Sequence, residues 1–309
     1  MNDAEINNIL HTCISLKPSD LIIDDLKWKY LVRGVLRGKN VMIIGSSGCA
    51  KTMSARCVAT ALNRPFEKFN FGSTDDARAT LIGNTTYQKS SGTIFHKSAF
   101  VKAITTPNTI VLLDELSRGT HSAWNILMTV IDIQRYLRLD ENESGEIINV
   151  ADGVCFIATT NVGNSYTSTK ILDKALLRRF PIKLEMPLLT AKQLLHLFDI
   201  HFPKRTDEET STMKILAQIS DDLIAQCNME DAKISDCISP ANIIEAAGLV
   251  MDGFTLPEIA EAAIFPEFQD DGGADSERAF CRSLIQKYIP SDAKSPINDP
   301  LKGKKKASF

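Results

Sequence analysis

One short segment constrains the fold of this chain more than any other. Val41 to Ile44 is a continuous apolar run, and a loop of small residues follows it before the helical spacing of residues 53–63 begins. That loop reads Gly45-Ser46-Ser47-Gly48-Cys49-Ala50-Lys51-Thr52. A buried strand, a tight glycine-containing loop and a helix in this order are typical of a parallel α/β sheet.

The rest of the chain fits such a sheet and then changes character. Apolar runs at 41–44, 66–71, 109–113, 154–158 and 183–185 alternate with helical stretches, which predicts a parallel sheet with helices on both faces. After residue 190 the strand signals end and helical periodicity takes over. We therefore expect a helical N-terminal segment (1–38), an α/β nucleotide-binding domain (39–189), a smaller all-helical lid (190–290) and a flexible basic tail (291–309).

Composition limits the cellular setting and the partners. The chain has 309 residues and a formal net charge of −3, and it lacks the run of about 20 apolar residues that a membrane helix needs. Its seven cysteines are scattered without CxxC pairs, which favours a reducing, cytoplasmic compartment over a disulfide framework. The near-neutral charge gives no sign of a dedicated DNA-binding protein.

The loop after the first strand is a candidate phosphate site. It departs from GxxxxGK[ST] because its second glycine comes early, giving G-x-x-G-x-x-K-T, but its backbone N–H groups still lie at a helix N-terminus. Lys51 can reach the β- and γ-phosphates of ATP, and the Thr52 hydroxyl can bind Mg²⁺. The alternative is a strand–helix turn without a ligand. The candidate nucleotide-binding residues are Gly45, Ser46, Ser47, Gly48, Cys49, Ala50, Lys51, Thr52 and Met53, together with Asp114.

Two later strands end in polar residues that would meet this loop. The apolar run 110–113 leads into Asp114 and Glu115, at the sheet edge where ligands bind. Asp114 would hold Mg²⁺, and Glu115 would act as general base on the attacking water. The strand at 154–158 leads to Asn161, whose amide would orient that water or contact the γ-phosphate, unless it only caps the loop.

Arginines follow at Arg178 and Arg179, directly before Phe180. An arginine in this place can act in trans on the nucleotide of a neighbouring subunit, where it contributes about 10³–10⁵ in rate. The alternative is a solvated basic pair at a helix end. A trans arginine requires an assembly, so this reading predicts a ring.

The order of these motifs resembles the AAA+ ATPases. Details resemble the MoxR-type group, and within it the branch of the CbbQ, NorQ and GvpN proteins: D-E-x-x-R at 114–118, a helix end at 130–137, and A-T-x-N at 158–161 followed by Tyr166-Thr167 and then by the L-R-R-F of 177–180. The resemblance implies that 45–52 is the Walker A loop and 114–115 the Walker B pair. It further implies that Asn161 is the first sensor, Arg179 the trans arginine, and Arg118 a second trans-acting or coupling arginine.

The resemblance also implies a partner and shows two departures. Such proteins form rings, six subunits being expected here, and commonly work with a protein that carries a von Willebrand factor A domain. Ala241 stands where the family has its second-sensor arginine, and Arg178 replaces a residue that is usually acidic. The region 71–96, with Thr86, Tyr87 and Lys89, is expected to be a loop that either grips a substrate or is plain surface.

The function that fits these patterns best is a Mg²⁺-dependent ATPase ring that remodels a partner protein. A DNA-acting motor or loader remains an alternative, for which Lys302–Lys306 in the tail would be a contact. A nucleotide-gated scaffold with little turnover is a third, because Ala241 cannot replace a guanidinium.

Overall fold

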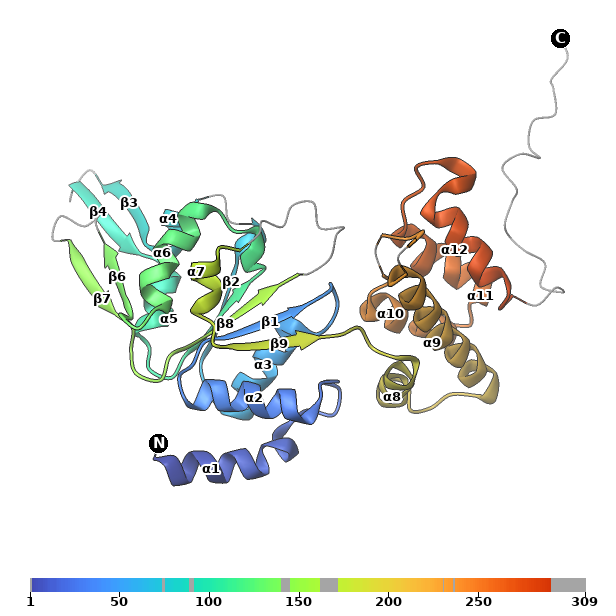
Figure 1. The fold of residues 1–309 in the computed structure, drawn as a ribbon, viewed down its shortest axis with the longest axis horizontal. Helices are drawn as coiled ribbons and strands as arrows, with labels where there is room; N and C mark the ends of the chain where they lie inside the picture. Colours follow the sequence, from blue (N-terminus) through green and yellow to red (C-terminus); the bar gives the residue numbers. More distant parts are fainter. Residues whose placement is uncertain are drawn as a thin grey trace, which may run out of the picture. The chain divides into compact units, whose positions relative to one another are not determined.

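The computed structural model describes residues 2–73, 76–88, 92–139, 145–161, 172–229, 231–235 and 237–289. The chain divides between Pro187 and Leu188 into two compact units, which are described separately (Figure 1). The expected basic tail 291–309 and the Tyr166-Thr167 motif lie outside the described residues.

The first unit is built on a five-stranded parallel sheet. Its order is β2-β5-β8-β1-β9, which confirms the predicted α/β fold class. The strands are β1 (Val41–Gly45), β2 (Phe66–Asn70), β5 (Ile110–Asp114), β8 (Cys155–Thr160) and β9 (Ile182–Met186). All residues of β5 and β8 are buried, as expected of apolar runs in a sheet covered on both faces. The edge strand β9 alternates between buried and more exposed residues, whereas β2 buries only Phe69.

Helices cover both faces of this sheet (Figure 1). On one face lie α2 and α3, and on the other lie α5, α6 and α7. The bounds of the helices in this unit are α1 (Asp3–Thr12), α2 (Asp25–Leu36), α3 (Lys51–Ala61), α4 (Ala77–Leu81), α5 (Ala99–Thr105), α6 (His121–Ile131) and α7 (Lys174–Arg178), with 3-10 turns η1 (Cys13–Leu16), η2 (Phe71–Ser73) and η3 (Leu116–Arg118). The buried Trp28 indole of α2 donates to the carbonyl oxygen of Cys13 (2.7 Å), which ties α2 to the N-terminal segment.

The strand order brings three strand ends together. In the register of the sheet Ile44 lies beside Thr160, and Leu113 lies beside Ala158. The carboxyl ends of β1, β5 and β8 therefore lie side by side at one edge of the sheet. Any ligand held by the loop after β1 must lie next to the residues that end β5 and β8.

Two antiparallel hairpins were not predicted. The region 71–96 was expected to be a loop, but it contains β3 (Gly83–Gln88) paired with β4 (Gly92–Lys97). The segment 130–137 does contain the expected helix end, because α6 ends at Ile131, but it also contains the start of β6 (Tyr136–Leu139), which pairs with β7 (Glu146–Asn149). Lys97 and Glu146 form an ion pair of 2.8 Å that joins the two hairpins. Lys89 lies outside the described residues.

The second unit is helical in its described part. Its helices are α8 (Ala191–His201), α9 (Asp207–Cys227), α10 (Pro240–Met251), α11 (Leu256–Ile259) and α12 (Glu277–Gln286), with the π-helical turn η4 (Ala260–Ile264) and the 3-10 turns η5 (Phe265–Glu267) and η6 (Gly273–Asp275). Capping boxes at Thr190, Thr206 and Thr255 fix where α8, α9 and α11 begin. Within the described ranges no helix is long and apolar enough to cross a membrane.

Candidate functional site

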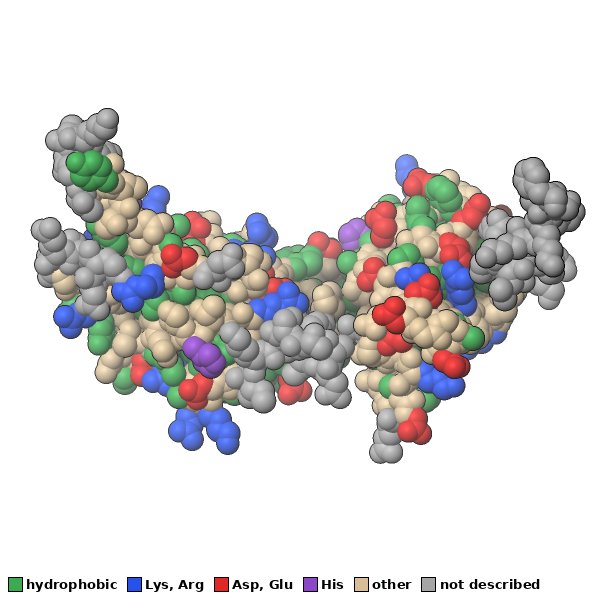
Figure 2. All heavy atoms as spheres, turned by 90° about the horizontal axis from the view of Figure 1, so that it is seen from above, with side chains coloured by type: hydrophobic (Ala, Val, Ile, Leu, Met, Phe, Trp, Pro, Cys, Tyr) green, Lys and Arg blue, Asp and Glu red, His purple; other side chains and the backbone are tan. Residues whose placement is uncertain are grey.

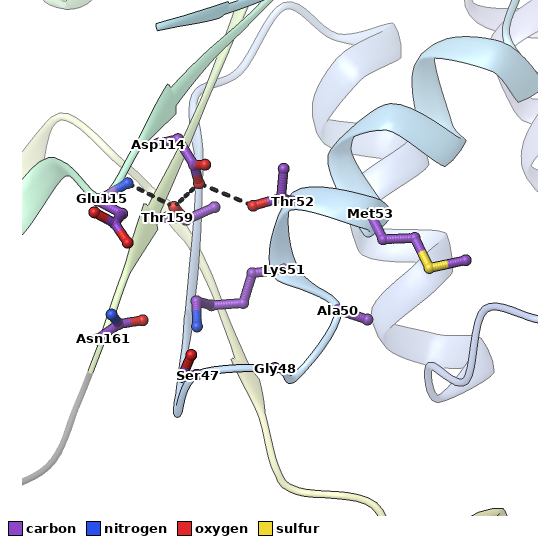
Figure 3. Close-up of a pocket in the computed structure, with 10 residues that line it drawn as sticks. All are labelled: Ser47, Gly48, Ala50, Lys51, Thr52, Met53, Asp114, Glu115, Thr159 and Asn161. Atoms are coloured by element: carbon purple, nitrogen blue, oxygen red, sulfur yellow. Dashed lines mark hydrogen bonds between the residues drawn. The ribbon is translucent and has the colours of Figure 1, made fainter. Parts of the chain in front are cut away.

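A pocket of about 310 Å³ opens where β1, β5 and β8 end. Figure 3 shows the loop after β1 on one side of it, and Glu115 and Asn161 on the other. The lining residues are Ser47, Gly48, Ala50, Lys51, Thr52, Met53, Asp114, Glu115, Thr159 and Asn161. Seven of the predicted nucleotide-binding residues and two of the predicted catalytic ones are therefore brought together in one cavity.

The loop after β1 has a backbone that its sequence only partly explains. Gly45 is required by close packing, because a Cβ there would lie 2.4 Å from the carbonyl oxygen of Met186 on β9. Gly48 has a φ of 76°, which glycine adopts without strain. Ala50 has a φ of 55° and begins α3 as its N-cap. An L-residue carries a cost in this left-handed region, and Ala50 stands where GxxxxGK has its second glycine.

The Lys51 ammonium is folded back onto the loop. Its Nζ donates to the carbonyl oxygens of Gly45 (2.9 Å) and Ser46 (2.6 Å). The residue is buried, and burial lowers the pKa of Lys51 although Asp114 and Glu115 favour its charged form. Its positive charge is thus held at the pocket by weak neutral acceptors, which an anionic phosphate would replace favourably.

Asp114 is the most heavily bonded side chain of the site. Its Oδ1 accepts from Thr52 Oγ1 (3.0 Å) and Thr159 Oγ1 (2.5 Å), and its Oδ2 pairs with Lys68 Nζ (2.7 Å). Burial alone would raise the pKa of Asp114, but the hydrogen bonds from Lys68, Thr159 and Thr52 outweigh it, and the pKa is lowered. Asp114 is therefore a carboxylate in this structure at neutral pH.

Thr159 and Lys68 were missed by the sequence analysis. Thr159 Oγ1 accepts from the backbone N–H of Glu115 (2.9 Å) while it donates to Asp114, so it joins the ends of β5 and β8. Its place directly before Thr160 and Asn161 was a signal, but the sequence analysis assigned the polar role to Asn161. Lys68 lies on the edge strand β2, where a lysine has the pattern of an ordinary surface residue.

Glu115 lies beside Asp114 in a strained backbone conformation. Its φ is 53°, and its Oε2 is 3.4 Å from Arg118 Nη1. A Cβ on Gly72 would lie 2.0 Å from the same Oε2, so the carboxylate rests against the backbone of η2. In this structure Arg118 therefore contacts Glu115 of its own chain, whereas the resemblance implied a trans-acting or coupling arginine.

The two arginines after α7 differ in their surroundings. Arg179 is half-buried, and its guanidinium donates to the carbonyl oxygen of Ala175 (2.7 Å) and to Asp132 Oδ2 (2.8 Å). Arg178 is exposed, and its side chain makes no hydrogen bond or ion pair with the parts of the chain that the structure describes. The structure brings neither into the pocket of its own chain.

A buried asparagine links the backbone of Arg179 to β1. The Asn40 side-chain amide donates to the carbonyl oxygens of Ile131 (2.7 Å) and Arg179 (2.9 Å). Because β1 starts at the next residue, the end of α6, the end of α7 and the start of β1 share one anchor.

The other predicted residues lie close to the pocket or in the second unit. Gly45, Ser46 and Cys49 belong to the loop without lining the pocket. The Cys49 thiol is buried, and burial raises its pKa, so it is in the neutral form. Ala241 lies exposed in the first turn of α10, after the N-cap Ser239.

The donor set fits Mg²⁺ rather than a softer metal. Thr52 Oγ1 and Asp114 Oδ1 are hard oxygen atoms 3.0 Å apart on facing elements. Mg²⁺ prefers one or two such protein ligands, with phosphate oxygens and water completing its shell. Among the described residues there is no group of three or more His, Cys, Asp or Glu that would hold a metal by itself.

Comparison with known proteins agrees with this geometry. Residues 40–180 match the family described as "AAA domain (dynein-related subfamily)". The Thauera aromatica protein named "Putative chaperone BssE" is 33% identical over 142 residues, 46% of this chain and 48% of that protein. The uncharacterized protein YojN of Bacillus subtilis is 28% identical over 194 residues, 62% of this chain and 60% of that protein. The chain spans about half the length of the curated relatives it matches.

Solved structures share the fold at low sequence identity. A Cytophaga hutchinsonii protein described as a "putative ATPase" gives a TM-score of 0.50 at 16% identity and covers 93% of this chain and 96% of its own. RuvB of Thermotoga maritima gives 0.52 at 17%, covering 88% and 80%. Hsp104 with ATPγS gives 0.52 at 17%, covering 71% and 45%. The family match over residues 40–180 supports the predicted AAA+ ATPase domain, and the solved structures share its fold; the MoxR branch stays a prediction.

Proposed function

We propose that this chain is a Mg²⁺-dependent ATPase that works as a ring, with six subunits expected, and uses hydrolysis to remodel a partner protein. One observation carries the proposal: Thr52 at the start of α3 and Asp114 at the end of β5 share a hydrogen bond beside Lys51, with Glu115 on the side of the pocket opposite the loop (Figure 3). This arrangement supports the proposal of a phosphate-binding loop, a Mg²⁺ pair and a carboxylate base around one cavity.

The chain's own residues then divide the work of hydrolysis. The N–H groups at the start of α3 and the Lys51 ammonium bind the phosphates. Thr52 and Asp114 would hold Mg²⁺, which neutralises phosphate charge. Glu115 orients the attacking water and accepts its proton, and its carboxylate must leave its contact with Arg118 to do so. Asn161, on the same wall, would fix the position of that water.

We propose Arg179 as the arginine that acts on the neighbouring subunit. To do so it must leave Asp132 and the carbonyl oxygen of Ala175, and a partly exposed ion pair of this kind contributes little to stability. A trans arginine contributes about 10³–10⁵ in rate, or about 4–7 kcal/mol. The gain exceeds the cost, so the pair with Asp132 is compatible with a role in trans.

Exposed apolar side chains on both hairpins favour a polypeptide substrate. Tyr87 on β3 is 76% exposed and Ile147 on β7 is 57% exposed, so both side chains are available to contact a polypeptide. The relative named as a chaperone points the same way. A partner with a von Willebrand factor A domain is part of this proposal and rests on the resemblance of the sequence.

The two alternative functions are a DNA-acting motor or loader and a nucleotide-gated scaffold. On the face shown in Figure 2, Lys and Arg side chains are interspersed with Asp and Glu in both units, whereas a DNA motor concentrates positive charge along its track. A nucleotide-gated scaffold is favoured by one observation, the exposed Ala241 at the second-sensor position. A wild type that hydrolyses ATP no faster than Glu115→Gln in single turnover would support the scaffold.

The first experiment measures ATP binding. Lys51→Ala should abolish it, because the only cation that lines the pocket in the described structure is removed. Lys39→Ala is the matched control, since Lys39 is exposed and precedes β1. Undiminished binding by the Lys51 variant would remove the phosphate-loop assignment.

The second experiment tests the shared site. Arg179→Ala should bind ATP and hydrolyse it slowly, whereas Arg178→Ala should stay near wild type. Mixing Arg179→Ala with Glu115→Gln subunits should restore part of the turnover, because some interfaces then combine an intact Glu115 with a neighbour's intact Arg179. An absence of recovery in mixed rings would count against a trans arginine. A loss of hydrolysis in Arg178→Ala alone would assign the trans role to Arg178 instead of Arg179.

A further inference from the structure

Lys68 is a charged group at the site to which the proposed mechanism gives no role. It lies on the edge strand β2, and its Nζ is 2.7 Å from Asp114 Oδ2. The Lys68 side chain is 38% exposed, whereas that of Asp114 is 8% exposed. The pair therefore joins a solvent-accessible cation to a buried carboxylate.

The alternation of β2 explains why this lysine reaches the site. Phe69 packs into the core against Phe100, while Phe66 lies on the opposite face under the guanidinium of Arg56 from α3. Lys68 shares that face with Phe66, because successive side chains of a strand point to opposite faces. In the register of β2 and β5, Asn70 lies beside Asp114, so Lys68 is two residues from that position and on the same face, within reach of a long side chain.

Lys68 balances the charge of Asp114 in the absence of a metal. Thr52 and Thr159 occupy Oδ1 with neutral hydroxyls, and Lys68 supplies the cation at Oδ2. A buried carboxylate without a counter-charge is unfavourable. The place of the positive charge next to Asp114 is therefore filled before Mg²⁺ enters with the nucleotide.

We propose that Lys68 is a built-in counter-ion of Asp114 that opposes Mg²⁺ at the same carboxylate and so sets the Mg²⁺ concentration at which nucleotide is held tightly. This inference rests on the proposed function, since it takes Thr52 and Asp114 as the Mg²⁺ pair. Lys68 acts through Asp114 and is a positioning residue. Its ammonium repels the metal, while its hydrogen bond keeps Oδ2 occupied when no metal is present.

The test is a Mg²⁺ titration of fluorescent mant-ADP binding to the full chain at constant ionic strength. Lys68→Met keeps the stem and removes the charge, and the Mg²⁺ midpoint should fall by about three- to tenfold, a range set by solvent screening of the partly exposed lysine. Lys68→Gln should follow Lys68→Met, and Lys68→Arg should restore the wild-type midpoint. Lys183→Met is the matched control, because Lys183 is an exposed lysine on β9, the opposite edge strand.

Each outcome decides the inference. A midpoint that rises in Lys68→Met shows that the lysine only orients Asp114, and an unchanged midpoint shows that it does not act on the metal; both overturn the inference and leave the proposed function standing. A wild type that binds no nucleotide overturns both.

A second measurement needs no nucleotide. Lys68→Met should lower the free energy of unfolding in the wild-type background and have a smaller effect in the Asp114→Asn background. Equal effects in the two backgrounds would show that the pair does not form in solution and would overturn the inference.

Discussion

The left-handed Ala50 leads to a stability prediction of unusual sign. An L-residue with a φ near 55° loses about 1–2 kcal/mol relative to a right-handed conformation. Glycine avoids this loss, but it makes the unfolded chain more flexible, at a cost of about 0.4–1 kcal/mol. The difference predicts that Ala50→Gly raises the free energy of unfolding by about 0.5–1 kcal/mol, although most substitutions lower it.

The assay is urea unfolding of the nucleotide-free chain followed by tryptophan fluorescence. The chain has two tryptophans, Trp28 and Trp124, and both are buried in the first unit. Their fluorescence therefore reports the unit that contains Ala50. The second unit has no tryptophan and contributes no signal.

A matched control has the opposite expected sign. Ala61 ends the same helix and has no left-handed backbone, so Ala61→Gly should lower the free energy of unfolding by up to about 1 kcal/mol. If Ala50→Gly lowers it as well, Ala50 is not strained in solution and the reasoning is refuted.

Three further predictions follow from contacts of the site. Gly45→Ala should lower the free energy of unfolding by about 1–3 kcal/mol in the same assay, because the new Cβ meets the Met186 carbonyl at 2.4 Å; an unchanged value would show that β1 and β9 are not so closely packed. Asp132→Asn should leave ATP binding unchanged and raise turnover up to about fivefold, because the ion pair with Asp132 no longer holds Arg179 in its own chain; reduced turnover would make Asp132 a support for the arginine. The pKa of Asp114 is lowered on folding, so its contribution to stability is present above the ordinary aspartate pKa and is lost as pH falls below about 4. The unfolding free energies of wild type and Asp114→Asn should therefore converge below that pH, and a constant difference would contradict the shift.

The sheet and its ligand edge were predictable because they rest on continuous apolar runs. A buried parallel strand has no polar face, so Val41, Val111 and Ile157 stand in runs that no surface segment would carry. The residue types at the strand ends then indicate the chemistry, and the structure brings Lys51, Thr52 and Asp114 to one pocket.

The remaining features depend on contacts between distant residues. The β3–β4 hairpin is rich in polar residues, and its pairing is set by the opposite strand rather than by an apolar run. Lys68 and Thr159 reach Asp114 from other strands. A lysine on an edge strand has the pattern of an ordinary exposed residue, so its contact with Asp114 could not be predicted from the sequence. The left-handed backbone of Ala50 and Glu115 is equally invisible, because neither residue type favours it.

The double hydrogen bond of Asn40 has a mechanical consequence. Its buried side chain donates both to the carbonyl oxygen of Arg179 and to that of Ile131, the last residue of α6. Asn40 also directly precedes β1, the strand that leads into the phosphate loop. In the ring proposed above, a pull on Arg179 by a neighbouring subunit would be transmitted through the Asn40 side chain to β1 and to the loop that follows it. The Asn40 amide would then couple the nucleotide loop of a subunit to the arginine that the same subunit is proposed to offer to its neighbour.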